Sequence, residues 1–447
     1  MKKRHILLGV VAFLAMGAGA AAYVVSPTVH GGRTSEAPEL GNVGAHTIGT
    51  TEQTFALEGR TKINAWGMLS GNLEDVEREV DVRFWYPANV SKDSAPITYS
   101  HDMAIPGQDV FKVDSLGTAI DGARATTGSK YPLVLMSHGF RGWNAQFSNL
   151  AEHIASRGYV VASIEHADAP VEGAASFFLS FGNVLADRSL DQRQVLAQIL
   201  NNAKNKHSSH WAQIDTENIG LIGYSMGGFG AIATAGAPYD FTANPMSSIP
   251  TASQERMKKA AENAAPIKAL VAFAPWGGQP DNRVWTAEAL KNIKQPVLLV
   301  AGQEDDVVNF KEGVTWLYEN MTHSDRRMLV YREARHNIVG NDFTLPKDAP
   351  FTVSEFLKEP VWRSDRINAI NQHFVTAFLD LYLKGDNSKE VFLNVPTVDA
   401  NDAAWPLSFG EQLNGKLAGP DQQDYWQGFQ RRWALGLEMR HKATDTE

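Results

Sequence analysis

Short unbroken runs of apolar residues recur through the middle of the chain and alternate with helix-like stretches. The runs occupy residues 133–136, 159–164, 219–222, 269–273 and 297–300. The helix-like stretches occupy residues 145–157, 190–202, 227–235 and 310–320. Unbroken apolar runs are typical of strands buried on both faces. Their alternation with helices predicts an α/β fold, with a mostly parallel central sheet and helices on both faces.

Two further strands are predicted around this core. Residues 80–86 alternate apolar and polar side chains and stop at Pro87, as a half-buried strand does. Residues 328–331 form another short apolar run, which we interpret as the last strand of the sheet. Ligands of such sheets bind beyond the carboxyl ends of the strands. The residues that follow each run are therefore the first to examine for chemistry.

The run at residues 219–222 is followed by the pentapeptide GYSMG at residues 223–227. A G-x-S-x-G pattern between a buried strand and a helix is the context of a nucleophile elbow, in which the serine occupies a strained turn. Side chains in place of the two glycines would collide with the neighbouring strand and helix. A glycine-rich helix start that packs closely is the alternative reading. The pattern predicts Ser225 as a nucleophile.

A serine nucleophile needs a base and an acid at other strand ends. His336 lies in the loop after residues 328–331 and is the predicted base, whereas His323 precedes that strand and falls at the wrong end of the sheet. Asp305 follows residues 297–300 and is the predicted acid. Its neighbour Asp306 is the second choice. Serine, aspartate and histidine then occur in the chain order of α/β-hydrolases.

A tetrahedral oxyanion needs two backbone N–H donors. Met226 follows the nucleophile and supplies the first donor in the prediction. Phe140, in the glycine-containing turn after residues 133–136, supplies the second. An ordinary strand-to-helix loop is the alternative reading of that turn.

Aromatic residues near these strand ends are pocket candidates. Trp276 comes directly after a strand, and Phe177 and Phe178 belong to the apolar segment 176–185. This segment could line an acyl pocket or form a cap. A helix packed on the core explains it equally well, and both readings stay open.

The chain resembles the α/β-hydrolase fold, and within it the dienelactone-hydrolase-like enzymes related to platelet-activating-factor acetylhydrolases. The likeness covers most of residues 60–390, and the segments that carry it are 131–140, 153–161, 165–168, 187–191, 371–375 and 383–386. It implies an exported serine esterase that needs no metal or other cofactor. True dienelactone hydrolases use a cysteine nucleophile, which this chain lacks. A shorter likeness, at residues 225–228 and 274–276, is to secreted polyester hydrolases of the cutinase type.

Composition narrows the chemistry further. The 447 residues include no cysteine, 41 Lys+Arg and 50 Asp+Glu, a formal charge of -9. This balance argues against a nucleic-acid partner, and the absence of thiols excludes a cysteine nucleophile, disulfides and Cys-ligated zinc. The histidines contain no HExxH pattern, and the pair His207 and His210 reads as a solvated helix end. No metal site is predicted.

The N-terminus carries an export pattern. Three basic residues precede an apolar run at residues 6–25, with small residues near its end. This pattern is typical of a cleavable signal peptide, but the run is also long enough for an uncleaved inner-membrane anchor. Either form predicts a periplasmic or secreted protein. Removal of the three basic residues would change the charge from -9 to -12, since 38 minus 50 is -12.

The predicted organisation has one catalytic domain. It comprises a signal or anchor at 1–25, a linker at 26–50, the catalytic domain at 51–400 and a C-terminal extension at 401–447. Insertions are expected near residues 167–187, 237–265 and 337–362. The aromatic residues of the extension are expected to pack onto the domain, and no oligomeric state is predicted.

The residues together predict hydrolysis of a small-molecule or lipid-like carboxylic ester through an acyl-enzyme. An amidase or peptidase of the same fold would share these residues, although no anchor for a charged peptide terminus is assignable. A polyester hydrolase is a further alternative. A non-catalytic binding protein on this scaffold typically loses the serine or the histidine, and both are present here.

Overall fold

The computed structural model describes residues 36–64, 75–91, 93–105, 108–205, 209–408, 410–411 and 424–445. They belong to one compact unit, Gly32–Glu447. The predicted export signal and residues 26–35 of the predicted linker lie outside the described residues. Within the described ranges, no helix has both the length and the apolar character needed to span a bilayer.

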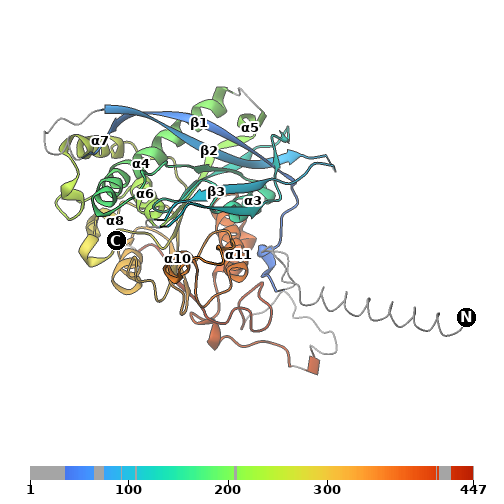
Figure 1. The fold of residues 1–447 in the computed structure, drawn as a ribbon. Helices are drawn as coiled ribbons and strands as arrows, with labels where there is room; N and C mark the ends of the chain where they lie inside the picture. Colours follow the sequence, from blue (N-terminus) through green and yellow to red (C-terminus); the bar gives the residue numbers. More distant parts are fainter. Residues whose placement is uncertain are drawn as a thin grey trace, which may run out of the picture. The chain divides into compact units, whose positions relative to one another are not determined.

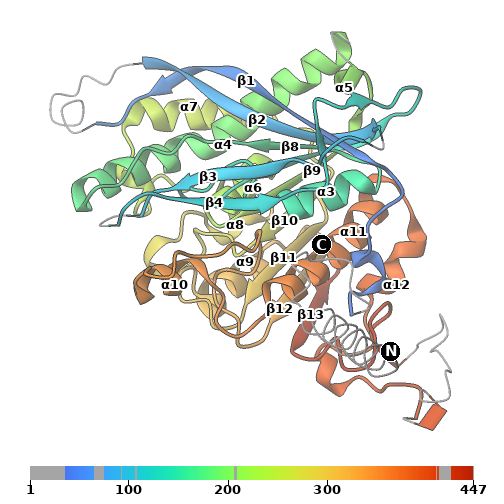
Figure 2. The ribbon, with the colours of Figure 1, turned by 45° about the vertical axis from the view of Figure 1, so that its right-hand side comes forward.

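A long mixed sheet forms the centre of the fold. Its strands are β1 (Ile48–Thr61), β2 (Asp75–Asn89), β5 (Ile120–Asp121), β6 (Arg124–Ala125), β7 (Tyr131–Ser137), β8 (Val160–Ile164), β9 (Ile214–Tyr224), β10 (Ala269–Phe273), β11 (Val297–Gly302), β12 (Arg326–Tyr331) and β13 (Leu437–Lys442). They follow the order β13-β12-β11-β10-β9-β7-β8-β2-β1-β5, with β6 paired to β2 (Figure 2). Strands β7 to β12 are parallel to one another. Strand β13 is antiparallel to β12, and β2 is antiparallel to β8, β1 and β6, whereas β1 and β5 are parallel. The predicted mostly parallel sheet is confirmed.

Helices cover both faces of this sheet. The bounds are α3 (Ser148–Ser156), α4 (Ala174–Asn205), α5 (Ser209–Ala212), α6 (Met226–Ala235), α7 (Thr251–Ala261), α8 (Ala287–Leu290), α9 (Thr315–Asn320), α10 (Phe351–Leu357), α11 (Ser364–Leu383) and α12 (Glu390–Leu393). A Cβ on Gly220 of β9 would lie 3.0 Å from Leu383 of α11. One on Gly223 would lie 2.4 Å from the Gly227 carbonyl of α6. Successive residues of a strand face opposite sides, so α11 and α6 pack on opposite faces of β9.

The alternating segment at residues 80–86 lies within β2, which pairs with the long strand β1 (Figure 1). Val80, Val82 and Phe84 are buried as the alternation predicts. Trp85 and Tyr86 are also buried, so the end of this strand is covered on both faces and the half-buried prediction is wrong there. A second small sheet, β3 (Thr98–Met103) and β4 (Phe111–Leu116), supplies Tyr99 against Trp85. The indole Nε1 donates to the Tyr99 hydroxyl at 2.7 Å.

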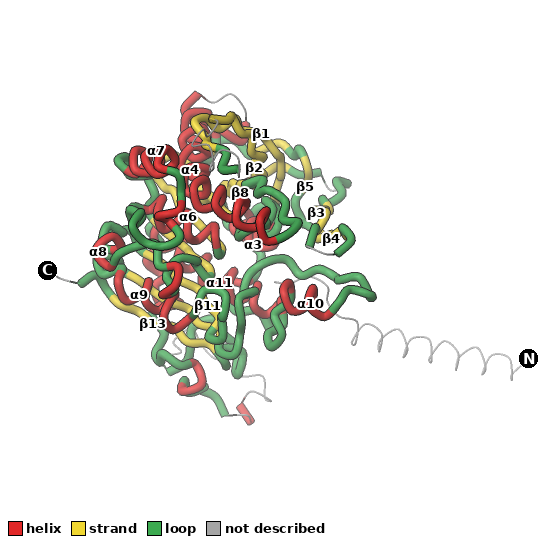
Figure 3. Tube along the Cα trace, turned by 60° about the vertical axis from the view of Figure 1, so that its left-hand side comes forward, coloured by secondary structure: helices red, strands yellow, loops and turns green. Residues whose placement is uncertain are grey.

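The segments expected as insertions have different structures. Residues 167–187 form a loop and the first turns of α4, which is much longer than the helix predicted at 190–202. Residues 237–265 include α7. Residues 337–362 are mostly loop with the short helix α10, visible as a red turn within a green segment in Figure 3.

The C-terminal segment completes the sheet. Strand β13 pairs antiparallel with β12 along its full length, so residues 328–331 do not form the last strand as interpreted from the sequence. Leu437 and Met439 of β13 are buried, and Trp426 and Phe429 pack in the core. Residues 424–445 therefore belong to the same compact unit as the other strands.

Residues 36–46, expected as part of a linker, pack on α11 around Leu40 and on the end of α3 around Gly44 and His46. Leu40 is buried, and its N–H donates to Nδ1 of His373 at 3.1 Å. A Cβ on Gly41 would lie 2.8 Å from the carbonyl oxygen of Ala369, so only glycine fits against the helix at this point. The compositional signal of a tether, rich in Gly and Thr, is therefore overridden here by specific backbone contacts.

We expect two buried histidines to make the fold sensitive to acid. Burial first, and Arg157 second, lower the pKa of His153 and of His373 to about 3. An unfolded chain protonates these side chains below about pH 6.5, so it binds more protons than the folded state and stability falls as the pH falls. Each histidine should cost about 2 kcal/mol of unfolding free energy between pH 7 and pH 5. Urea unfolding at both pH values measures this loss.

The variant His373→Gln should lose less stability over this interval than the wild type, because one of the two groups no longer titrates. His323→Gln, at a half-exposed position before β12, is the matched control. An identical pH dependence in wild type and His373→Gln would contradict the expectation.

Candidate active site

Ser225 occupies a tight turn between β9 and α6. Its φ is 52°, a left-handed conformation that is rare outside glycine. A Cβ on Gly227 would lie 2.0 Å from the carbonyl oxygen of Ser137 in β7, and one on Gly223 would meet the first turn of α6. The Ser225 N–H donates to the Phe273 carbonyl at 2.9 Å, and its carbonyl accepts from Trp276 N at 3.2 Å. The geometry is that of a strained strand-to-helix elbow that presents the serine hydroxyl.

His336 lies in the loop after β12 and contacts the serine. Its Nε2 is 3.1 Å from Ser225 Oγ, and its Nδ1 is 2.7 Å from Asp305 Oδ2. His323 precedes β12, at the other end of the strand. The structure therefore brings together the three residues predicted from the sequence as nucleophile, base and acid.

Asp305 and Asp306 have different environments although they are adjacent. Asp305 is buried, and its Oδ1 accepts from the backbone N–H groups of Val307 and Val308 at 2.9 and 3.1 Å. These bonds leave Oδ2 directed at the imidazole. The side chain of Asp306 is 62% exposed and pairs with Arg335. Asp305 is thus the only one of the two that contacts His336.

The ring of Tyr224 packs beside the His336 imidazole. The two ring centroids lie 5.2 Å apart, and the Tyr224 hydroxyl contacts the Asn337 side chain at 3.3 Å. Burial first, and the charge of Asp305 second, raise the pKa of Tyr224 well above its ordinary value. Tyr224 is therefore a neutral hydrogen-bond donor rather than an acid–base group at neutral pH.

The predicted oxyanion donors lie beside the serine. A Cβ on Gly139 would be 3.3 Å from Ser225 Cβ, so the loop that carries Phe140 runs against the nucleophile. Met226 is the first residue of α6, where backbone N–H groups have no partner within the helix. Among the described residues, no acceptor bonds the N–H of Phe140 or Met226. Two free donors and a helix N-terminus favour negative charge at this point.

Aromatic side chains pack together on one side of the loop that carries Phe140. Phe181 packs edge-on against Trp276 at 5.3 Å and against Phe140 at 5.8 Å between ring centroids. Phe177 stacks on Phe181 at 5.7 Å, and Phe178, 72% exposed, contacts Phe177 at 5.9 Å. We name these five residues the aromatic wall. The helix reading of residues 176–185 is confirmed, because they lie in α4, which packs on the core, whereas the acyl-pocket reading stays a prediction.

Phe181 is not among the pocket candidates that the sequence pattern indicates. It lies four residues after Phe177, the spacing that places two side chains on the same face of a helix. The signal was therefore present, but it depended on knowing that residues 174–185 are helical.

Metal ligands are not gathered near the site. Among the described residues, no group of three or more His, Asp or Glu side chains could hold a metal ion. His207 lies outside the described residues. His210 stacks on Tyr86 with ring centroids 5.7 Å apart, and burial lowers its pKa to about 4. Its position is that of a ring packed under β2.

Comparisons with known proteins find similarity in one segment of the sequence and in the fold. A family model described as platelet-activating factor acetylhydrolase, isoform II, matches residues 112–208. The chain is 40% identical over 52 residues to the platelet-activating factor acetylhydrolase of Cavia porcellus, covering 12% of this chain and 11% of that protein. The protein of the same name from Bos taurus is 41% identical over 46 residues, 10% of each chain. The match therefore spans about a tenth of the length of these relatives.

A ferulic acid esterase from Streptomyces cinnamoneus has a similar fold, with a TM-score of 0.50 and 21% identity over 80% of this chain and 93% of that one. Sheet order, elbow and structural neighbour together define an α/β-hydrolase fold, as predicted. The predicted resemblance to platelet-activating-factor acetylhydrolases is confirmed over residues 112–208, which include Phe140 and all of α4.

The elbow should not tolerate a side chain at Gly227. Gly227→Ala places a Cβ against the Ser137 carbonyl, so β7 and α6 must separate, and we expect the free energy of unfolding to fall by about 3 kcal/mol. Gly128→Ala is the control. No atom lies within 4 Å of the Gly128 Cβ position, so its cost comes only from its positive φ of 87°, which Gly227 does not share. It should cost about 1 kcal/mol. Equal losses in urea unfolding would contradict this explanation.

Proposed function

We propose that this protein is a serine hydrolase that cleaves carboxylic esters through an acyl-enzyme. The observation that carries the proposal is the chain of contacts from Ser225 Oγ through His336 to Asp305, with the serine at a positive φ. The local similarity to platelet-activating factor acetylhydrolases and the fold of a ferulic acid esterase support an ester as the substrate.

The first half of the proposed reaction acylates the serine. His336 Nε2 takes the proton of Ser225 Oγ as this oxygen attacks the ester carbonyl carbon. The tetrahedral oxyanion accepts hydrogen bonds from the N–H groups of Phe140 and Met226. Collapse breaks the bond to the alcohol oxygen, which leaves with the proton from His336. Asp305 remains ionised and holds the Nδ1–H of the imidazolium.

The second half removes the acyl group. His336 Nε2 takes a proton from water, and the hydroxide oxygen bonds to the acyl carbon. The same two N–H groups bind the second oxyanion. Its collapse breaks the bond to Ser225 Oγ, which regains the proton from His336, and the carboxylic acid departs. No residue in this sequence of steps requires a metal.

The Ser225→Ala variant should lose at least a thousandfold in kcat on p-nitrophenyl butyrate, because no other group can form the acyl-enzyme. A fluorophosphonate probe should label the wild type at Ser225 and leave the variant unlabelled, as read by mass spectrometry of the adduct. Asp305→Asn should lower kcat at least a hundredfold, whereas Asp306→Asn, at the exposed neighbour, should stay within twofold. Wild-type turnover in Ser225→Ala would exclude the assignment.

Hydrolysis of p-nitroanilides at a rate equal to that of the matched esters would favour the amidase alternative. A folded wild-type protein without any adduct would favour a binding protein.

The aromatic wall supports an apolar or aromatic group next to the scissile bond. Trp276→Ala and Phe181→Ala should each lower kcat/KM at least tenfold for p-nitrophenyl esters with longer acyl chains, because buried apolar contact is lost. The acetate ester, too short to reach the wall, should change less than threefold. Steady-state kinetics from acetate to palmitate measure this difference.

Val391→Ala, at an exposed position on α12, is the control and should leave the whole series unchanged. A wild-type response that is flat across the series would remove the pocket from the proposal.

A further inference from the structure

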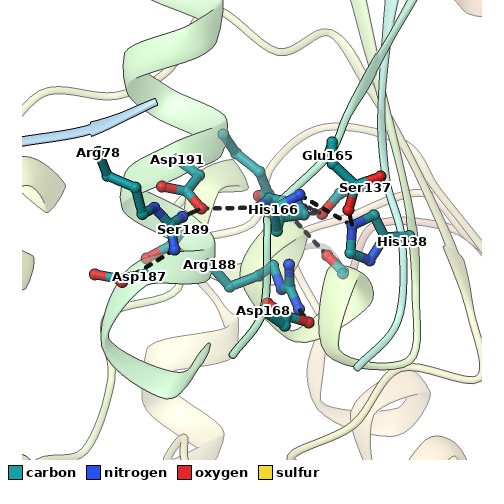
Figure 4. Close-up of polar contacts among 12 residues, drawn as sticks. Arg78, Ser137, His138, Glu165, His166, Asp168, Asp187, Arg188, Ser189 and Asp191 are labelled. Atoms are coloured by element: carbon teal, nitrogen blue, oxygen red, sulfur yellow. Dashed lines mark hydrogen bonds and ion pairs between the residues drawn. The ribbon is translucent and has the colours of Figure 1, made fainter. Parts of the chain in front are cut away.

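A buried cluster of charged and polar side chains lies behind the loop that carries Phe140. It joins the loop after β7, the loop after β8 and the middle of α4, and Figure 4 shows its contacts. Its members include Ser137, His138, His166, Asp168, Arg188 and Asp191. Their side chains are almost completely buried. None of them has a role in the proposed reaction. The burial of this many polar groups therefore needs another explanation.

The peptide group between Gly139 and Phe140 is held through its carbonyl oxygen. This oxygen accepts from His138 Nδ1 at 2.7 Å and from Arg188 Nη2 at 3.4 Å. A trans peptide is planar, so its C=O and N–H point in opposite directions. Bonds that hold the carbonyl toward the cluster therefore direct the Phe140 N–H away from it.

The tautomer of His138 follows from its hydrogen bond with the His166 backbone, because the other group near its Nε2, Glu165 Oε1, is 3.6 Å away and beyond hydrogen-bond distance. The His138 Nε2 is 3.0 Å from the backbone N–H of His166 and must accept from it. The neutral ring then carries its proton on Nδ1, which donates to Gly139. His166 is fixed in turn, because its Nδ1 contacts Asp191 at 2.8 Å and its Nε2 contacts Ser137 Oγ at 2.7 Å. His138 Nδ1–H is thus fixed as the donor to the Gly139 carbonyl oxygen.

Asp168 anchors the other side of Phe140. Its Oδ2 accepts from the backbone N–H of Arg141 at 2.7 Å and from Arg188 Nη2 at 2.8 Å. Arg141 has a φ of 56°, a conformation that requires support from its surroundings. The Asp168–Arg188 ion pair therefore binds the backbone on both sides of Phe140. Arg188 donates to the Gly139 carbonyl, and Asp168 accepts from the Arg141 N–H.

This pair is charged inside the protein. Burial acts to raise the pKa of Asp168, but the charge of Arg188 leads the contributions that bring it below its ordinary value. Removal of either partner would leave an uncompensated buried charge. The hydrogen bond from the Arg188 cation to the Gly139 carbonyl also polarises the Gly139–Phe140 peptide group, which makes the Phe140 N–H a stronger donor.

We propose that Asp168 and Arg188 are positioning residues that hold the Gly139–Phe140 peptide in the orientation in which its N–H binds the oxyanion. The inference rests on the proposed ester hydrolysis and assigns a task that the Ser225, His336 and Asp305 contacts do not perform. Their effect is on the transition state, because the oxyanion forms only there.

The test compares Asp168→Asn and Asp168→Ala in the full-length protein. In Asp168→Ala both hydrogen bonds are lost, and kcat on p-nitrophenyl butyrate should fall about a hundredfold while KM stays within threefold. The affinity for butyl trifluoromethyl ketone, whose serine adduct carries an oxyanion, should fall by the same factor. Asp168→Asn keeps an acceptor for Arg141 N–H without the charge, so it should show an intermediate loss of about tenfold. Asp168→Asn decides the question alone if Asp168→Ala does not fold.

Asp325→Asn is the matched control. Asp325 is a half-buried carboxylate that contacts Arg327, Tyr382 and His441 at the amino end of β12. It should lower stability in urea unfolding without changing kcat or the ketone affinity. A folded Asp168 variant with wild-type kcat and ketone affinity overturns the positioning role while the proposed function stands. A wild type with neither hydrolysis nor fluorophosphonate labelling overturns both.

Discussion

The backbone around Ser225 is packed so closely that the site depends on the absence of side chains at two positions. Gly227 meets the carbonyl of Ser137 in β7, and Gly223 meets the first turn of α6. This packing holds Ser225 at a positive φ, a conformation that costs about 1–3 kcal/mol where the surroundings enforce it. Because β7, β9, β10, β11 and β12 are parallel neighbours, their carboxyl ends bring the other groups to the same edge. The elbow is the fixed point around which those groups are arranged.

Much of the fold could be predicted because the central strands are buried on both faces and therefore have unbroken apolar sequences. The strand containing residues 297–300 follows from that pattern alone, and Ser225 follows from the G-x-S-x-G pattern directly after the run at 219–222. Strand β13 could not be found in this way, because an edge strand needs only Leu437 and Met439 on its inner face and is charged elsewhere. Residues 36–46 were equally hidden, since their contacts with α11 use backbone groups that composition does not report.

The site residues also differ in how far the sequence predicts them. Ser225, His336 and Asp305 follow strand ends and could be predicted from spacing. The physical difference between Asp305 and Asp306, burial and two backbone N–H groups, exists only in the folded loop. Asp168 and Arg188 lie in segments that carry the family likeness, but the sequence assigns them no role, because an arginine and an aspartate 20 positions apart look like ordinary helix and loop residues. Their contacts exist only once β7, β8 and α4 have come together. Sequence patterns thus reveal groups tied to one strand end, and miss groups whose partners come from three elements.

Helix α4 carries two different surfaces on one continuous rod. Its first turns carry Phe177, Phe178 and Phe181 of the aromatic wall, and its buried middle holds Arg188 against the loop that carries Phe140. The two surfaces are therefore separated along the helix axis by about two to three turns. Natural variation or directed evolution can remodel the aromatic surface to accept a new ester without disturbing the charged segment that supports the chemistry. This separation makes the helix a favourable place for substrate range to diverge while the reaction is conserved.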